Sequence, residues 1–203
     1  MKAILSVFIS FVLPFLLSAT PLAYSKASGR LWKNISSQDK VRLDNYLSMS
    51  QKNMGSKSKE SVMIASAYLD SAYMLCEKKR IDCPALLHLL KADLYSQSRD
   101  YTRSEEEAKI ALEKAESSKE YDIQAKAMLF LGRYYRLTGF YKESIDFFTK
   151  SIALAKKHNL KGIIPQAYHS QAEIYQGAND YKSHRLNLEL MIEAAYAEND
   201  TSM

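Results

Sequence analysis

Residues that bend or break the backbone are scarce in this chain. Among its 203 residues there are 6 glycines and 4 prolines, while alanine, leucine, lysine, glutamate and tyrosine are plentiful. So few glycines leave little material for a phosphate-binding loop, and neither GxGxxG nor GxxxxGK occurs. The composition therefore predicts an all-α protein with short connections between its helices.

Residues that commonly build catalytic and metal sites are also few. The 4 histidines stand far apart and form no HExxH pair, and no GxSxG occurs. The acidic run Glu105-Glu106-Glu107 lies beside Lys109, in a setting where such charges are normally solvated. We therefore expect no enzymatic activity, no metal site and no cofactor.

Charge of one sign does not dominate either. The chain has 28 lysines and arginines against 23 aspartates and glutamates, which gives a net charge of +5. No run of five like charges occurs. Since nucleic-acid binding normally requires a concentrated basic surface, we do not expect a nucleic-acid partner.

The first 27 residues differ in character from the rest. Lys2 is followed by an almost unbroken apolar run from Ala3 to Leu17, which is interrupted at Pro14, and small residues follow. This order is typical of a secretory signal peptide, and the run falls short of the ~20 residues that a spanning helix needs. We predict a cleaved signal peptide at 1–27 and a mature protein in the periplasm or outside the cell, without membrane contact. An uncleaved N-terminal anchor is the alternative.

Export changes the interpretation of the 2 cysteines. Cys76 and Cys83 are seven residues apart, and an even pair in an oxidising compartment indicates a disulfide. Such a bond would join the end of one predicted helix to the start of the next, which begins at Pro84. The alternative is two free thiols that serve as small core residues.

Two helical patterns follow one another between Gln124 and Asn159. In each pattern small or apolar residues lie three or four apart, which places them on one face of a helix. They are Met128, Leu131, Gly132 and Tyr135 in the first pattern, and Ser144, Phe148, Ser151, Ile152 and Ala155 in the second. Gly139, which can adopt positive φ, stands between them. This stretch is therefore predicted to form an antiparallel helix hairpin.

Positions of this hairpin recur at intervals of 40 residues. The recurring sets are Asp100-Tyr101, Phe140-Tyr141 and Asp180-Tyr181; Tyr95, Tyr135 and Tyr175; and Ala92, Gly132 and Ala172. A less regular unit precedes them between Ser37 and Arg80. A single hairpin cannot bury its apolar face, so we predict about four hairpins stacked as an α-solenoid over 37–197. A flexible arm at 28–36 and a frayed tail at 198–203 flank it.

The central hairpin resembles the tetratricopeptide repeat (TPR). The resemblance rests on Leu-Gly-x-x-Tyr at 131–135, a small residue at Ser144 and Phe148 four residues later. The period of 40 exceeds the usual 34, as in long-helix members of the family. The neighbouring units depart from the pattern, since Lys91-Ala92 and Gln171-Ala172 replace Leu-Gly. The resemblance implies a concave groove, lined by the first helix of each hairpin, that binds proteins or peptides.

We assign the groove to the face of each first helix that is left when the packing positions are removed. The predicted partner-binding residues are Lys126, Leu129, Arg133 and Arg136 in the central unit, Asp93 and Gln97 one period earlier, and His169, Glu173 and Gln176 one period later. Lys126, Arg133 and Arg136 together could accept a carboxylate or an acidic peptide segment. The alternative is a solvated face on which Arg133 pairs with Asp93 or Glu173.

These features predict an exported adaptor or scaffold that mediates protein–protein or protein–peptide interaction in a secretion or envelope assembly. One alternative is a periplasmic module that senses a ligand or peptide and acts on a separate receptor. Another is a structural module that forms homo-oligomers through the exposed ends of the solenoid.

Overall fold

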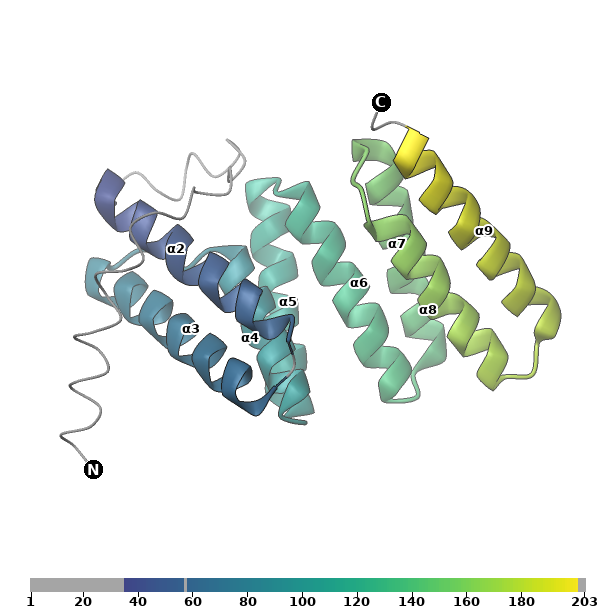
Figure 1. Cartoon of the computed structure of the whole chain (residues 1–203), viewed down its shortest axis with the longest axis horizontal. Helices are drawn as coiled ribbons and strands as arrows, with labels where there is room; N and C mark the ends of the chain where they lie inside the picture. Colours follow the sequence, from purple (N-terminus) through teal and green to yellow (C-terminus); the bar gives the residue numbers. More distant parts are fainter. Residues whose placement is uncertain (1–34, 57, 201–203) are drawn as a thin grey trace.

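All regular secondary structure in the described part of the chain is α-helical. The computed structural model describes residues 35–56 and 58–200 (Figure 1). Its helices are α2 (Ser37–Met54), α3 (Lys59–Lys79), α4 (Ala85–Gln97), α5 (Tyr101–Ser118), α6 (Tyr121–Leu137), α7 (Tyr141–His158), α8 (Ile163–Gly177) and α9 (Tyr181–Asp200). None of these helices is both long enough and apolar enough to cross a bilayer. The predicted signal peptide, most of the predicted arm and residues 201–203 lie outside the described residues.

The helices pack as four consecutive antiparallel hairpins: α2 with α3, α4 with α5, α6 with α7, and α8 with α9. Each hairpin also packs on the next, and Figure 1 shows the first and last hairpins at opposite ends of the molecule. The buried side chains form separate clusters along the chain, as expected when each unit contacts only its neighbours. The predicted fold class, an all-α array of about four hairpins, is confirmed.

The turn within each of the last three hairpins has the same geometry at intervals of 40 residues. In each turn one residue has positive φ, and the next residue donates its N–H to the carbonyl of a tyrosine. The positive-φ residues are Arg99 (62°), Gly139 (86°) and Asn179 (57°), and the accepting carbonyls belong to Tyr95, Tyr135 and Tyr175. This arrangement satisfies a carbonyl that the end of the helix leaves free. The turn predicted at Gly139 is confirmed.

A hydrogen bond, buried in two of these hairpins and partly buried in the last, joins the two helices of each at equivalent positions. The Ser104 hydroxyl donates to the Ala92 carbonyl at 2.9 Å, and the Ser144 hydroxyl donates to the Gly132 carbonyl at 2.7 Å. In the last hairpin His184 Nδ1 lies 3.0 Å from the Ala172 carbonyl. Since a carbonyl only accepts, Nδ1 carries the proton there. The three bonds hold the second helix at one height against the first.

Gly132 lets α6 and α7 pack closely in the central hairpin. Phe148 is 0% exposed, and a Cβ added to Gly132 would lie 2.5 Å from its ring. One period away on either side the phenylalanine is replaced by Ala108 or Leu188, and the glycine by an alanine. The small first-helix residue is therefore matched to the bulk of the residue that faces it.

The connections between hairpins differ from the expected boundaries in small ways. The helix expected from about Lys119 begins at Tyr121, because Lys119 has a φ of 59° and ends α5. Asn159 has the same left-handed conformation one period later. At the C-terminal end α9 continues to Asp200, beyond the expected limit at Ala197.

A carboxylate from α5 ties the second hairpin to the third. Glu105 accepts hydrogen bonds from the hydroxyls of Tyr134 at 3.0 Å and Tyr135 at 2.8 Å, and it pairs with Lys109 at 2.7 Å. The bond from Lys109, followed by those from the two tyrosines, lowers the pKa of Glu105 against the opposing effect of burial. Burial and the negative Glu105 together raise the pKa of Tyr134 to about 12. This network stays charged and intact at neutral pH.

The close approach at Gly132 predicts a stability change. Gly132→Ala should lower the free energy of unfolding by about 1–3 kcal/mol, because the new methyl group overlaps the Phe148 ring. Phe148→Leu should recover part of that loss in the double variant, since the last hairpin combines alanine with leucine. Gly177→Ala, where a Cβ meets nothing within 4 Å, is the matched control. Urea unfolding followed by circular dichroism measures all three. Equal stability of Gly132→Ala and the unaltered protein would contradict the packing.

The Glu105 network predicts a pH dependence. Because its hydrogen bonds lower the pKa of Glu105, its contribution is complete above the ordinary glutamate value of about 4.3 and is lost as the pH falls through the lowered value. Glu105→Gln should therefore cost about 1–2 kcal/mol at pH 7, and this difference should shrink below about pH 4. Thermal unfolding between acidic and neutral pH measures it. Glu106→Gln, an exposed neighbour on the same helix, is the control, and a pH-independent difference would refute the assignment.

Candidate functional site

The predicted partner-binding residues come from three first helices that pack side by side. Asp93 lies on α4, Arg133 and Arg136 lie on α6, and Glu173 lies on α8. The helices α4, α6 and α8 contact one another in that order. The 40-residue period thus places equivalent positions of successive hairpins in one row. We call Asp93, Arg133, Arg136, His169 and Glu173, with Gln166 beside them, the first-helix stripe.

Arg133 is half-buried in this stripe and has a neutral partner. Its Nη2 donates to Gln166 Oε1 at 2.8 Å, across from α6 to α8. Burial lowers the pKa of the Arg133 guanidinium, and the charge on Arg136 acts in the same direction. Asp93 and Glu173 oppose this shift. The charged form is therefore held in a setting that favours it less than water does.

Arg136 is only partly satisfied. Its Nη2 lies 3.4 Å from Glu173 Oε2, and the same oxygen lies 3.9 Å from His169 Nδ1. The Nε of Arg136 is buried and has no hydrogen-bond acceptor among the described residues. A buried donor without an acceptor costs about 1–3 kcal/mol, so this position is suited to an added acceptor.

Arg133 and Arg136 are the two cations of the stripe that the sequence predicts to bind a carboxylate. A guanidinium presents its N–H groups as a fork that matches a carboxylate. The two nearest opposite charges, Asp93 and Glu173, come from the flanking helices and limit the surplus of positive charge. A carboxylate is therefore the ligand chemistry that these two side chains match.

Two predicted members of the site are placed differently. Leu129 is 3% exposed and packs with Phe148 and Ile163 in the core between the third and fourth hairpins, so its side chain is not part of the surface. Periodicity placed it on the stripe, but the neighbouring hairpin covers that part of α6. Lys126 pairs with Asp122 on its own helix at 2.7 Å.

The remaining predicted residues lie around the arginines. Gln97 is half-buried on the last turn of α4, and Gln176 is exposed near the end of α8. The alternative of a self-paired face expected Arg133 to bind Asp93 or Glu173. In the structure Glu173 pairs with Arg136, Arg133 donates to Gln166, and the charges of Asp93 and Glu173 also act on Arg133. The stripe is therefore partly self-paired, and Arg136 Nε has no acceptor within the part of the chain that the structure describes.

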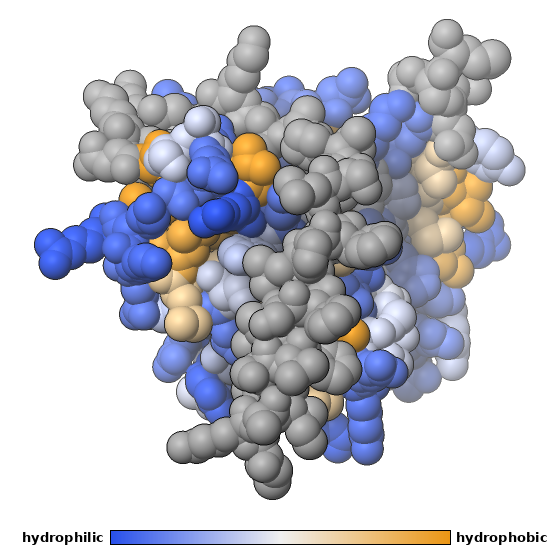
Figure 2. All heavy atoms as spheres, turned by 60° about the vertical axis from the view of Figure 1, so that its left-hand side comes forward, coloured by the Kyte–Doolittle hydropathy of each residue, from blue (hydrophilic) through white to orange (hydrophobic). Residues whose placement is uncertain are grey.

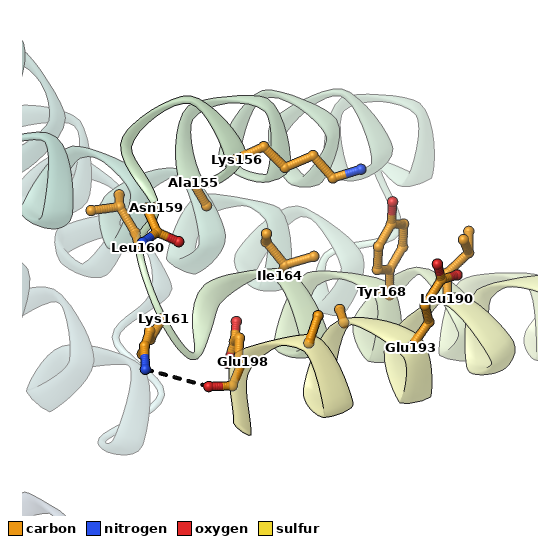
Figure 3. A pocket seen from close by; sticks show the side chains of 12 residues that line it. Ala155, Lys156, Asn159, Leu160, Lys161, Ile164, Tyr168, Leu190, Glu193 and Glu198 are labelled. Carbon is orange, nitrogen blue, oxygen red and sulfur yellow. Dashed lines mark hydrogen bonds between the residues drawn. The ribbon is translucent and has the colours of Figure 1, made fainter. Parts of the chain in front are cut away.

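A hollow that the sequence does not indicate lies between α7, α8 and α9 (Figure 3). It has a volume of about 400 Å³, and Leu160, Ile164 and Leu190 supply much of its apolar lining. Figure 3 shows Ile164 and Tyr168 rising from α8 between the other two helices. No local pattern points to it, because its walls come from helices whose spacing depends on packing.

Charged groups border this hollow. Lys161 donates from Nζ to the Glu198 carbonyl at 3.3 Å, and the Gly162 N–H donates to Glu198 Oε2 at 2.9 Å. Lys156 extends from α7 with its Nζ 6.0 Å from the centre of the Tyr168 ring. These contacts hold the end of α9 against the start of α8. The hollow therefore has an apolar lining and charged groups at its border.

The outer side of the first hairpin carries apolar residues in small patches. In Figure 2 this end of the molecule is turned forward, and where grey atoms do not cover it, the apolar patches lie among hydrophilic side chains. Met63 and Met74 on α3 are 73% and 67% exposed. Methionines in such positions adapt to varied partners, but these patches are small and separate. A homo-oligomer, the other alternative, would use such exposed apolar surface, but these patches do not mark a specific contact.

Comparison with known proteins does not assign a family. No protein-family model, curated protein sequence or solved structure matches the chain. Within residues 35–56 and 58–200 no three histidine, cysteine, aspartate or glutamate side chains gather as a metal site would require. What the chain does must therefore be inferred from the surfaces themselves.

The half-buried charge of Arg133 predicts that replacing this arginine by an apolar residue does not destabilise the protein. Arg133→Met should leave the protein as stable as before or more stable, by up to about 1 kcal/mol, because methionine fills the same volume without a buried charge. Glu173→Gln should destabilise it, since Arg136 loses its carboxylate. Thermal unfolding in low salt measures both, with Lys126→Met as the surface control. A clear loss of stability in Arg133→Met would show that this arginine serves the fold.

Proposed function

We propose that the chain is an exported, tetratricopeptide-type adaptor that binds a peptide segment through a carboxylate held by Arg133 and Arg136. The family assignment is supported by the 40-residue period in the turns and in the buried hydrogen bonds between paired helices. The Leu-Gly-x-x-Tyr pattern at 131–135 and the fit of Gly132 to Phe148 add to it.

One observation carries the proposed ligand: the buried Nε of Arg136 has no acceptor among the described residues. This donor lies beside a second, half-buried guanidinium, and Arg136 has Glu173 as its carboxylate partner. A bound carboxylate would supply the missing acceptor and relieve the repulsion between the arginines. Catalysis needs further groups that this stripe lacks, so binding is the activity proposed.

The dimensions of the stripe indicate the size of the ligand. Packed helices lie about 8–10 Å apart, so α4, α6 and α8 together span roughly 16–20 Å. An extended peptide rises about 3.3 Å per residue, which gives a bound segment of about six residues. Its carboxylate would meet Arg133 and Arg136 at the middle, and polar groups would meet Gln97 and His169 on either side.

Export places this adaptor in the periplasm or outside the cell. The signal peptide predicted at 1–27 is the basis for that proposal. In that compartment, a peptide-binding adaptor would serve a secretion or envelope assembly. The partner is a protein or peptide, and no nucleic acid is involved.

A ligand-sensing module that acts on a separate receptor is the second candidate. The hollow between α7, α8 and α9 favours it, because about 400 Å³ is within the range of small-molecule sites. A ligand there would contact the last hairpin and leave the arginines of the stripe untouched. The two candidates therefore predict different sensitive residues.

Fluorescence anisotropy with labelled hexapeptides tests the adaptor. Peptides with aspartate, glutamate or a free C-terminal carboxylate should bind, and their amide counterparts should bind at least tenfold more weakly. The double variant Arg133→Gln and Arg136→Gln should show the same loss for the acidic peptides and no further loss for the amides. A tenfold change corresponds to about 1.4 kcal/mol, within the range for one charge-assisted hydrogen bond.

Lys150→Gln, on the exposed side of α7, controls for the loss of a positive charge. Equal binding of acidic and amide peptides would refute the carboxylate site. Binding that is abolished by Ile164→Asp, and not by the arginine changes, would support the sensor. Pull-down from native envelope fractions, with the triple variant Lys126→Ala, Arg133→Ala and Arg136→Ala as comparison, then identifies the partner.

A further inference from the structure

We propose that Cys76 and Cys83 form a site of reversible thiol–disulfide exchange, in which Cys83 reacts first and the resulting bond fixes the first hairpin to the second. The two cysteines lie 3.0 Å apart, which is not a disulfide distance, and both are present as thiols. The neighbourhood expected from the sequence is confirmed, and the expected bond is not formed in the structure. This proposal is independent of the peptide site.

The backbone between the two cysteines is held in place. Arg80 has a φ of 52° and ends α3, and the N–H groups of Arg80 and Ile81 both donate to the Cys76 carbonyl. Cys83 then directly precedes Pro84, the N-cap of α4. A disulfide needs about 2.05 Å between its sulfurs, so the pair is close to bonding distance without having reached it.

The two sulfurs differ in their surroundings. Cys76 is 1% exposed within the core cluster of the first two hairpins, and Cys83 is 9% exposed at its edge. Lys114 lies close enough to favour a Cys83 thiolate, although Asp82, its ion-pair partner, opposes this. Cys83 also stands just before the N-terminus of α4, where the helix dipole favours negative charge.

The hydrogen bond between the two thiols separates their acidities. It lowers the pKa of Cys83, with Lys114 and Lys91 acting in the same direction against burial. The same bond, followed by burial, raises the pKa of Cys76. These directions agree with the greater exposure of Cys83, which is therefore assigned as the thiol that reacts first.

The exchange needs a disulfide as oxidant, either a small one such as oxidised glutathione or that of an oxidoreductase. The Cys83 thiolate attacks one sulfur of that disulfide and releases the other as a thiolate, which leaves a mixed disulfide on Cys83. Cys76 then attacks the Cys83 sulfur. The second oxidant sulfur leaves, takes up the Cys76 proton and departs as a thiol. Two thiols are thereby oxidised to one disulfide, and one disulfide is reduced to two thiols.

The bond would act at the joint between the first two hairpins. Cys76 packs with Leu69 and Ala72 of α3, and Leu87 and Leu90 of α4 belong to the same cluster. α3 and α4 pack together less extensively than the two helices within a hairpin do. A disulfide between them would therefore add a restraint that packing alone provides only weakly. Reduction would leave the first hairpin free to open from the second by local fluctuations.

Intact mass spectrometry of the folded full chain tests the assignment. The protein is incubated with oxidised glutathione, free thiols are blocked with N-ethylmaleimide, and the mass is measured. The unaltered chain should end as an internal disulfide that takes up no maleimide and no glutathione. Cys76→Ala should retain one glutathione on Cys83, and Cys83→Ala should react at least tenfold more slowly.

Hydrogen exchange supplies a second measurement that does not depend on the single variants. Oxidation should slow exchange at residues 80–83 and at the start of α4, and the double variant Cys76→Ala and Cys83→Ala should show no such response. Circular dichroism confirms that each variant keeps its helices. Equal reactivity of the two single variants would overturn the assignment of Cys83. A bridge that forms only in denaturant would overturn the site itself.

Discussion

The close contact between the two helices of each hairpin is the constraint on which the rest of the structure depends. In the central hairpin Gly132 leaves room for the Phe148 ring, and the Ser144 hydroxyl binds the Gly132 carbonyl. The flanking hairpins repeat the hydrogen bond with Ser104 and His184. Because the contact sets the height and rotation of the second helix, successive hairpins present the same faces to one another. A change in its geometry would misalign every unit that follows.

The first-helix stripe is a consequence of that alignment. Arg133 and Arg136 reach Gln166 and Glu173 because α6 and α8 are held in parallel register by their own hairpins. The local chemistry is less complete than that of the core: a guanidinium has a neutral partner, and a buried Nε has no acceptor among the described residues. Protein interiors normally satisfy such groups. Incomplete pairing at a surface where three helices meet is the observation that supports the proposed binding position.

Much of the fold was predictable because its signals are local. Positive φ at Gly139, the start at Tyr141 and the period of 40 each depend on residues a few positions apart. The site was predictable only in part. Periodicity assigned Arg133, Arg136 and Glu173 to one stripe correctly, but it also assigned Leu129, which the next hairpin buries. A helical repeat tells which residues share a face, and the angle between hairpins decides how much of that face is covered.

The sequence by itself determined the helix hairpins, their turns and the spacing that brings Cys76 close to Cys83, since each of these follows from backbone preferences over short distances. Tertiary structure alone decided the pairing of Arg136 with Glu173, the burial of Leu129 and the hollow between α7, α8 and α9. These features join residues of different hairpins. Their distances depend on how side chains of particular volume pack between helices. The angle and separation of two packed helices cannot be predicted from the pattern of residues along one of them.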